Sequence, residues 1–251
     1  MSDSTKRFSN RVDNYVKYRP GYPKEVIDYL EKECHLSAQS AIADVGAGTG
    51  IFTKLLLEKG YKVYAVEPND AMREEADRQL KHFPSYHSMV GKADLTGLTS
   101  QSIDLIVCAQ AFHWFNTPET KAEFQRILKP GGQAALIWNN RDIEADLFAT
   151  AYDTLLKTQS GGDYERINHQ NLTKADFDSF YADYSLTKFP NQQVFDFEQL
   201  AGRAFSSSYV PIEDTEAGRT FKEKLKTIFD QYQKDGEVIF RYDTEVYLGN
   251  V

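Results

Sequence analysis

The sequence of 251 residues has few of the features that mark disulfide-rich, membrane-spanning or secreted proteins. Its two cysteines, Cys34 and Cys108, are too few for a disulfide framework and form no CxxC pair. The longest uninterrupted apolar runs, at 105–109 and 134–138, are five residues each, whereas a transmembrane helix needs about 20. The opening MSDSTKRFSN lacks the apolar core of a secretory signal. We therefore expect a cytoplasmic protein with no membrane partner.

Basic residues are also in deficit, and the usual hydrolase and metal motifs are missing. The chain has 29 Lys and Arg against 37 Asp and Glu, a net charge of -8 with histidine neutral, which argues against nucleic acid as the main partner. It has no P-loop, HExxH or GxSxG motif, and its five histidines show no metal-ligand spacing, so no metal is expected. Hydrophobic residues make up 41% and charged residues 26%, as in ordinary globular proteins.

Short apolar runs alternate with amphipathic segments from about residue 41. This pattern predicts helices that begin at Ile51, at Asn69 or Asp70, and at Thr117, and that end near residues 60, 80 and 128. It predicts a turn at 129–132, where the sequence reads KPGG, and strands at 41–45, 63–66, 86–91, 103–109 and 133–138. Continuous apolar strands that alternate with helices indicate an α/β fold whose parallel sheet is covered by helices.

The flanking regions are less regular. Residues 1–35 are predicted to be mostly helical, and residues 142–185 contain a polar break and many aromatic residues. A helix at about 220–233 precedes a stretch at 238–248 whose apolar and polar positions alternate, which is typical of an antiparallel strand. We expect a single domain spanning 1–251, with a helical lid at 1–35, a cofactor-binding core at 36–141, and a substrate-side cap with C-terminal strands at 142–251.

A glycine-rich turn joins the first predicted strand to its helix. It reads DVGAGTG from Asp44 to Gly50, and Glu67 ends the next strand about 20 residues later, where a carboxylate can accept hydrogen bonds from ribose hydroxyls. The dinucleotide fingerprint GxGxxG requires glycine where Ile51 stands, and Asp44 would repel a pyrophosphate. The turn thus favours a cationic nucleoside, although an NAD-type oxidoreductase stays open as an alternative.

Several further motifs accompany this turn. Together with VYAVEP at 63–68, ADL at 93–95 and LKPGG at 128–132, it resembles the class I S-adenosylmethionine-dependent methyltransferases. The stretches YRPGYP at 18–23, QAFHWF at 110–115 and WNNR at 138–141 are similar to the methyltransferase type 11 group, in its trans-aconitate-methyltransferase-like branch. The resemblance covers most of residues 8–141. It implies a Rossmann-like, doubly wound, mostly parallel seven-stranded sheet with an antiparallel C-terminal strand and inserted cap helices.

The resemblance also implies S-adenosylmethionine as cofactor, with S-adenosylhomocysteine as product. It places Asp44 near the methionine ammonium and Glu67 on the ribose hydroxyls. Beneath the methionine and ribose portions of the cofactor it places Gly46, Ala47, Gly48 and Gly50. Around the adenine it places Pro68, Asp94 and the Leu95 amide. Along the methyl path and over the methionine carboxylate it places Gln110, Ala111 and Arg19, with Tyr15 or Tyr18 closing the lid. Asp104 is an alternative to Asp94.

On the acceptor side, the expected residues are Tyr15, His113, Trp114, Trp138 and Arg141. His113 is either a general base or a histidine packed beside Phe112 and Trp114, and Arg141 is a candidate bidentate clamp for a carboxylate.

The resulting hypothesis is methyl transfer to a small-molecule acceptor, with a carboxylate as the acceptor that needs no base. The open alternatives are an NAD-type oxidoreductase, a nucleic-acid or protein methyltransferase, and a protein that binds S-adenosylmethionine without turnover. Either a monomer or a homodimer fits the sequence.

Overall fold

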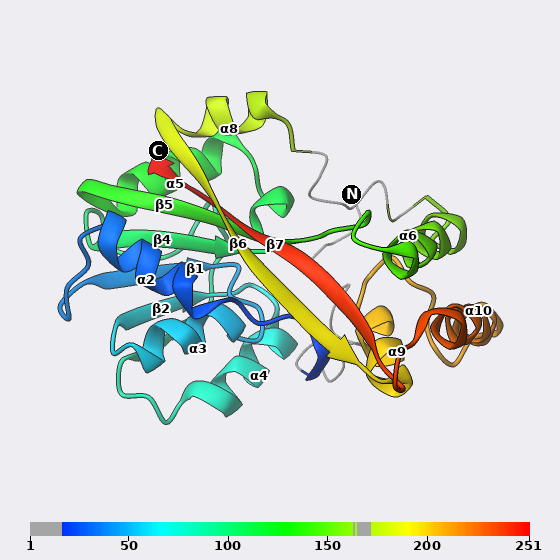
Figure 1. Ribbon diagram of the computed structural model, residues 1–251. Coiled ribbons are helices and arrows are strands. Elements are labelled where there is room, and N and C mark those ends of the chain that lie inside the picture. The colour runs from blue at the N-terminus through cyan, green and yellow to red at the C-terminus, as the bar shows by residue number, and fades with distance from the viewer. Residues whose placement is uncertain (1–16, 163, 165–171) are drawn as a thin grey trace.

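The computed structural model describes residues 17–162, 164 and 172–251 (Figure 1). The strands are β1 (Ala41–Val45), β2 (Lys62–Val66), β3 (Tyr86–Met89), β4 (Ile103–Ala109), β5 (Leu128–Arg141), β6 (Asp183–Phe195) and β7 (Val238–Asn250). The α-helices are α2 (Lys24–Glu33), α3 (Ile51–Glu58), α4 (Asp70–Leu80), α5 (Pro118–Ile127), α6 (Leu147–Gln159), α8 (Lys174–Phe180), α9 (Phe197–Phe205) and α10 (Glu216–Tyr232). A 3₁₀ turn, η2, spans Phe112–Trp114.

The seven strands form one sheet in the order β3-β2-β1-β4-β5-β7-β6. Strands β1 to β5 pair in parallel, and β7 runs antiparallel to both β5 and β6. Helices α2, α3 and α4 pack on one face of the sheet, and α5 and α8 pack on the other. The predicted Rossmann-like, doubly wound fold is therefore confirmed, and the carboxyl ends of β1, β2, β4 and β5 meet at one edge.

Local sequence sets the start of several helices. The side chain of Asn69 accepts a hydrogen bond of 3.0 Å from the Met72 amide and caps α4, as predicted. Thr117 caps α5 in the same way, with Pro118 in the first helical position, where its missing N–H costs nothing. Within the described part of the chain, no helix has both the length and the apolar character needed to cross a membrane.

The turn predicted at 129–132 is wrong, because these residues lie inside strand β5. Ile103 pairs with Leu128 and Leu105 pairs with Gln133, so the extra residues of β5 form a bulge against β4. The Lys129 ammonium lies 2.7 Å from the Asp104 carboxylate, and a Cβ at Gly132 would lie 3.1 Å from the Ile103 carbonyl oxygen. These close contacts hold the bulge against the neighbouring strand, so the chain does not turn away.

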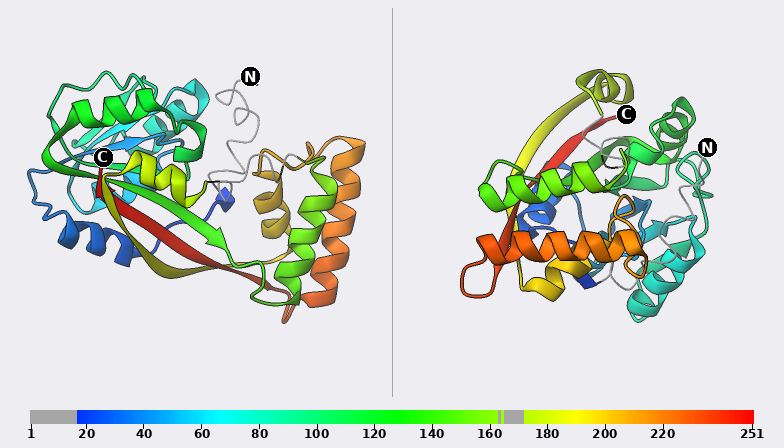
Figure 2. Two further views of the ribbon diagram at one scale, coloured as in Figure 1. Left: turned by 90° about the horizontal axis from the view of Figure 1, so that it is seen from above. Right: turned by 90° about the vertical axis from the view of Figure 1, so that its right-hand side faces the viewer.

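The C-terminal third contains two long antiparallel strands, where the sequence predicted one. Strand β6, which the sequence did not reveal, pairs with β7 along its whole length, from Asp183 opposite Asn250 to Phe195 opposite Val238. Beyond the core, the far ends of β6 and β7 reach a lobe made by α6, α9 and α10 (Figures 1 and 2). This lobe has its own cluster of buried apolar side chains, including Phe221, Leu225 and Phe240.

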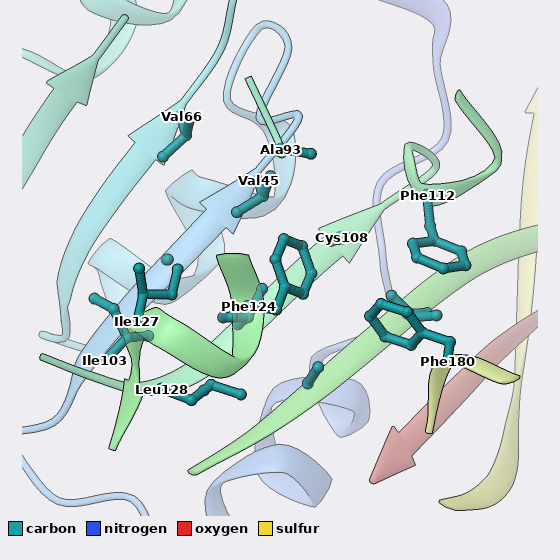
Figure 3. Close-up of a cluster of buried hydrophobic side chains, with 14 of the residues drawn as sticks. Val45, Val66, Ala93, Ile103, Cys108, Phe112, Phe124, Ile127, Leu128 and Phe180 are labelled. Carbon is teal, nitrogen blue, oxygen red and sulfur yellow. The ribbon is translucent and has the colours of Figure 1, made fainter. Parts of the chain in front are cut away.

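Aromatic rings hold helices α5 and α8 onto the sheet. Phe180 of α8 makes edge-to-face contacts with Phe112 (ring centroids 4.5 Å apart) and with Phe124 of α5 (5.8 Å). Figure 3 shows the Phe112 and Phe180 rings next to each other, beside β4 and β5. Because η2 carries Phe112 directly before His113, this packing also fixes the loop that follows β4.

We therefore expect Phe180→Ala to lower the free energy of unfolding by about 3–5 kcal/mol, because it leaves a cavity between three buried rings. Urea denaturation followed by circular dichroism measures this change. Leu147→Ala, at a side chain that is 72% exposed, serves as the control and should change stability by less than about 0.5 kcal/mol. Equal effects of the two variants would contradict the packing described here.

Candidate active site

The glycine-rich turn after β1 is tied to the end of β2. The amides of Gly46 and Ala47 both donate to the carbonyl oxygen of Val66, at 2.9 and 3.2 Å. Gly46 has a φ of +75°, and a Cβ there would lie 2.7 Å from the Cβ of Ala111. Glycine is therefore required at 46 for both conformation and space. The contact also brings the turn against the loop that follows β4.

Gly48 lies on the open side of the same turn. Its φ is +57°, and a Cβ there would meet no atom within 4 Å. Its amide donates to Oε2 of Glu67 at 2.8 Å. The backbone at this point is thus accessible to a ligand that lies over the turn.

Glu67 directly follows the last residue of β2, at the strand end where it was predicted, and two backbone amides hold its carboxylate. Oε1 accepts from the Asn69 amide at 2.8 Å, in addition to the bond between Gly48 and Oε2. Burial raises the pKa of the Glu67 carboxyl above its usual value, and the two amides only partly offset this. Each carboxylate oxygen can accept a further hydrogen bond, which suits a pair of ribose hydroxyls.

Asp44 is almost entirely buried beneath the turn, with an exposed fraction of 1%. Its Oδ2 accepts a hydrogen bond of 2.6 Å from the Thr53 hydroxyl, while its Oδ1 has no hydrogen-bond partner among the described residues. Burial raises the pKa of Asp44 to about 7, with a smaller opposing effect from Thr53. A cation bound nearby would favour the ionised carboxylate. Asp44, Gly48 and Glu67 together therefore fit a ligand with a positive charge and vicinal hydroxyls.

The turn after β3 carries the residues expected at the adenine. Lys92 and Leu95 exchange two backbone hydrogen bonds of 3.1 Å, so the Leu95 amide assigned to the adenine is already donated to Lys92. That detail of the prediction is therefore corrected, because a tight turn uses this amide. Asp94 is exposed on the turn, and the Leu95 side chain is 71% exposed. Pro68 follows Glu67 and is half-buried.

Asp104, the alternative to Asp94, lies at the opposite edge of the sheet. It contacts Lys129, and its Oδ2 accepts a hydrogen bond of 2.8 Å from the amide of Ala41, the first residue of β1. The amino end of a parallel strand faces away from the glycine-rich turn, so Asp104 is a structural residue and Asp94 remains the candidate.

The loop after β4 brings Gln110, His113 and Trp114 to the site edge. Gln110 has a φ of +59°, an uncommon conformation for a residue other than glycine, and its amide donates to Ile137 at 2.8 Å. The indole Nε1 of Trp138 donates to Nδ1 of His113 at 3.4 Å. In the neutral imidazole, the hydrogen therefore lies on Nε2. Trp114 is half-buried beside His113.

Trp138 is not a wall of the acceptor pocket as predicted. Its side chain is fully buried and packs edge-to-face against Phe177 and Tyr247 in the core. The reason is the alternation of β5, which turns this position toward α8. Trp138 thus acts on the site only by fixing the orientation of the His113 ring.

The segment before α2 joins the core to the lobe. The Tyr18 ring packs against α9, where a Cβ at Gly202 would lie 2.1 Å from it, and Arg19 Nη2 donates to the Ser206 carbonyl at 3.2 Å. The Gly21 carbonyl oxygen accepts hydrogen bonds from the side-chain amides of Asn139 and Asn191, at 3.1 and 3.0 Å. Tyr18 and Arg19 thus lie against the cap. Tyr15 and the first part of the predicted lid lie outside the described residues.

Arg141 ends β5 inside the lobe. Its Nη2 lies 3.3 Å from Oδ1 of Asp153 and donates to the Tyr164 hydroxyl at 3.1 Å, and its guanidinium covers the Tyr152 ring. It is thus a buried group with partners of its own, and its role as a carboxylate clamp stays a prediction. Within the described ranges, no group of three or more His, Cys, Asp or Glu side chains is placed to hold a metal.

Comparison with known proteins agrees with this geometry. Residues 43–136 match a family model described as a methyltransferase domain. An uncharacterized methyltransferase-like protein of Schizosaccharomyces pombe is 38% identical over 138 residues, which cover 55% of this chain and 53% of that protein. The chain spans about half the length of the curated relatives it matches.

Solved structures show the same fold. A protein of Anaeromyxobacter dehalogenans, described as a candidate type II methyltransferase, has a TM-score of 0.68 at 20% identity, with 93% of this chain and 98% of that chain covered. A phosphoethanolamine N-methyltransferase of Haemonchus contortus, solved with S-adenosylhomocysteine, has a TM-score of 0.54 at 13% identity, with 97% and 58% covered. At these identities the matches show that the chain shares its fold with these proteins.

The burial of Asp44 predicts a pH-dependent stability in the absence of ligand. Burial raises the pKa of Asp44 from its usual value of 3.8 to about 7. The folded protein therefore binds more protons than the unfolded chain between pH 4 and 7, and the free energy of unfolding falls as pH rises through this range. The free energy of unfolding of the native protein should fall by on the order of a few kcal/mol over this range, and Asp44→Asn should remove that fall. Urea midpoints of both proteins from pH 5 to 8 measure it. Parallel curves would show that Asp44 does not titrate there.

Proposed function

We propose that this protein transfers the methyl group of S-adenosylmethionine to a carboxylate oxygen of a small-molecule acceptor. The observation that carries the cofactor assignment is the arrangement of Asp44, Gly48 and Glu67 around one turn. Asp44 has a buried carboxylate oxygen without a hydrogen-bond partner among the described residues, which can face a cation. The backbone of Gly48 is open to a ligand, and the Glu67 carboxylate is held in place to accept hydrogen bonds from ribose hydroxyls. Arg19 would bind the methionine carboxylate, and Pro68, Asp94 and the exposed Leu95 side chain would border the adenine.

The bound cofactor would supply a methyl group that positive sulfur has already activated. The work left to the protein is positioning, because a nucleophile held about 3–3.5 Å from the methyl carbon, opposite the sulfur, gains roughly 7–11 kcal/mol over free encounter. In this proposal Gly46, Ala47 and Gly50 shape the floor of the crevice, and Gln110, Ala111 and Trp114 border the methyl path. The close approach of Gly46 to Ala111 supports this, because it places the two loops side by side.

The histidine tautomer favours an acceptor that arrives already deprotonated. With the Trp138 indole donating to Nδ1, neutral His113 carries its hydrogen on Nε2 and cannot accept a proton there. A carboxylate is ionised near pH 7 and needs no general base, whereas an alcohol or phenol would need one. His113 is therefore assigned a positioning or hydrogen-bond-donating role.

The wider assignment follows the sequence resemblance. We place the protein in the trans-aconitate-methyltransferase-like branch on the motifs at 18–23, 110–115 and 138–141. We also propose a single-domain, cytoplasmic enzyme, a monomer or homodimer without a metal requirement. An NAD-type oxidoreductase fits less well, because buried Asp44 lies where a pyrophosphate would pass.

Glu67→Gln should weaken binding of S-adenosylhomocysteine by about tenfold or more, because a carboxylate that accepts ribose hydroxyls is replaced by a weaker acceptor. Isothermal titration calorimetry measures the change. Glu58→Gln, on the exposed side of α3, is the matched control and should bind as the native protein does. Equal affinities in the two variants would refute the role of Glu67.

His113→Ala should lower turnover by less than about tenfold if the acceptor is a carboxylate, since general base catalysis itself contributes 10²–10⁴-fold. The acceptor is first found by incubating the protein with small carboxylic acids, phenols and amines and labelled S-adenosylmethionine, with products read by mass spectrometry. A loss above a hundredfold, or methylation of phenols alone, would overturn the carboxylate assignment. A protein that binds the cofactor and methylates none of these compounds would fit a non-catalytic binding protein.

A further inference from the structure

A group of arginines lies buried where the lobe meets the end of β5. Arg141 ends that strand with a side chain that is 10% exposed, and Arg203 of α9 is 7% exposed. The Nε atoms of both guanidinium groups are buried, and neither has a hydrogen-bond partner among the described residues. Buried N–H donors are almost always paired, so two such donors in one region require an explanation.

Further polar groups lie close to these arginines. Arg203 Nη1 lies 3.2 Å from the Ser207 hydroxyl oxygen and 3.5 Å from that of Ser206, whose carbonyl oxygen accepts the bond from Arg19. The Tyr209 ring packs edge-to-face on the Tyr164 ring, with centroids 5.0 Å apart, and the Tyr164 hydroxyl accepts a hydrogen bond from Arg141. Burial raises the pKa of Tyr209, but the three guanidinium groups lower it, and the net change is downward. Three guanidinium groups therefore act on the Tyr209 phenol.

Among the described residues, the negative charge near these cations does not balance them. Oδ1 of Asp153 contacts Arg141 and also accepts a hydrogen bond of 2.6 Å from the Tyr164 hydroxyl. Oδ2 of Asp153 lies 2.8 Å from the Lys157 ammonium. The remaining neighbours that act on Arg141 and Arg203 are tyrosines, with Tyr152 and Tyr242 acting on both. In the described part of the chain, this cluster thus has more positive than negative charge. A buried excess of charge is costly unless a ligand of opposite charge occupies the site.

We propose that Arg141, Arg203 and Tyr209 form a site for an anionic oxygen group of the acceptor, a carboxylate or a phosphate, separate from the atom that is methylated. This inference rests on the proposed function. The site lies past the carboxyl end of β5, at the sheet edge that also carries the Asp44 turn and Glu67. An acceptor would be anchored here by one anionic group while another part of the molecule reaches the methyl group. The substrate class is thus small molecules with an anionic anchor.

The test measures anion binding separately from catalysis. Glutarate, inorganic phosphate and the uncharged glutaramide are titrated by calorimetry into the full-length protein with saturating S-adenosylhomocysteine. We expect glutarate or phosphate to bind and glutaramide not to bind. Arg203→Gln should weaken the anion at least about tenfold without changing S-adenosylhomocysteine affinity. Arg219→Gln, an exposed arginine of α10, is the matched control and should leave both affinities unchanged.

Two further measurements keep the test decisive if Arg203→Gln does not fold. Glutarate should raise the melting temperature of the native protein more than sodium chloride of equal ionic strength does. It should also raise the pKa of one tyrosine, read from absorbance near 295 nm, and Tyr209→Phe should abolish that titration.

The outcomes separate the two proposals. Absence of binding by both anions while S-adenosylhomocysteine binds, or equal binding by glutaramide, overturns the anion site. The anion site is also overturned if Tyr209 is already ionised at pH 7 and its titration does not change when glutarate is added. Anion binding without any S-adenosylhomocysteine binding supports the anion site and refutes the proposed function.

Discussion

The carbonyl oxygen of Val66 accepts hydrogen bonds from both Gly46 and Ala47, and the rest of the site depends on this contact. It holds the turn after β1 against the end of β2, so that Gly48 meets the Glu67 carboxylate and Asp44 lies buried beneath. Two amides that would otherwise be orphaned at the end of a strand are thereby satisfied. With the turn fixed, the loop after β4 can approach only if position 46 has no side chain.

The central sheet and the cofactor side could largely be predicted from the sequence. Strands such as β1 and β4 are apolar apart from one aspartate each, because helices cover both faces of the sheet. Glycine or asparagine marks the ends of the helices between them. The roles of Asp44 and Glu67 depend on residues close to them in sequence, such as Thr53 and Asn69. Local patterns of this kind are visible without a structure.

Other features depend on contacts between distant residues. Strand β6 is largely exposed and carries polar side chains, so no apolar alternation marked it, and only its pairing with β7 makes it a strand. The bulge at 129–132 reads as a turn until Asp104 and Lys129 are brought together. Arg141 and Arg203 lie in separate elements with no shared motif, and nothing in the sequence indicated that both are buried near Tyr209. Likewise, the alternation of β5 alone did not reveal that Trp138 faces the core.

The attachment of the segment around Tyr18 and Gly21 has a consequence for selectivity. This short stretch is bonded to the ends of β5 and β6 through Asn139 and Asn191, and its Tyr18 ring fills the space left by Gly202 on α9. It thus acts as a spacer of fixed length between the sheet and the helical lobe. Because a Cβ at position 202 would overlap this ring, glycine there allows α9 to approach the segment so closely. If methyl donor and anionic anchor lie on opposite sides of this spacer, a glycine that touches neither helps to set the reach of an accepted molecule.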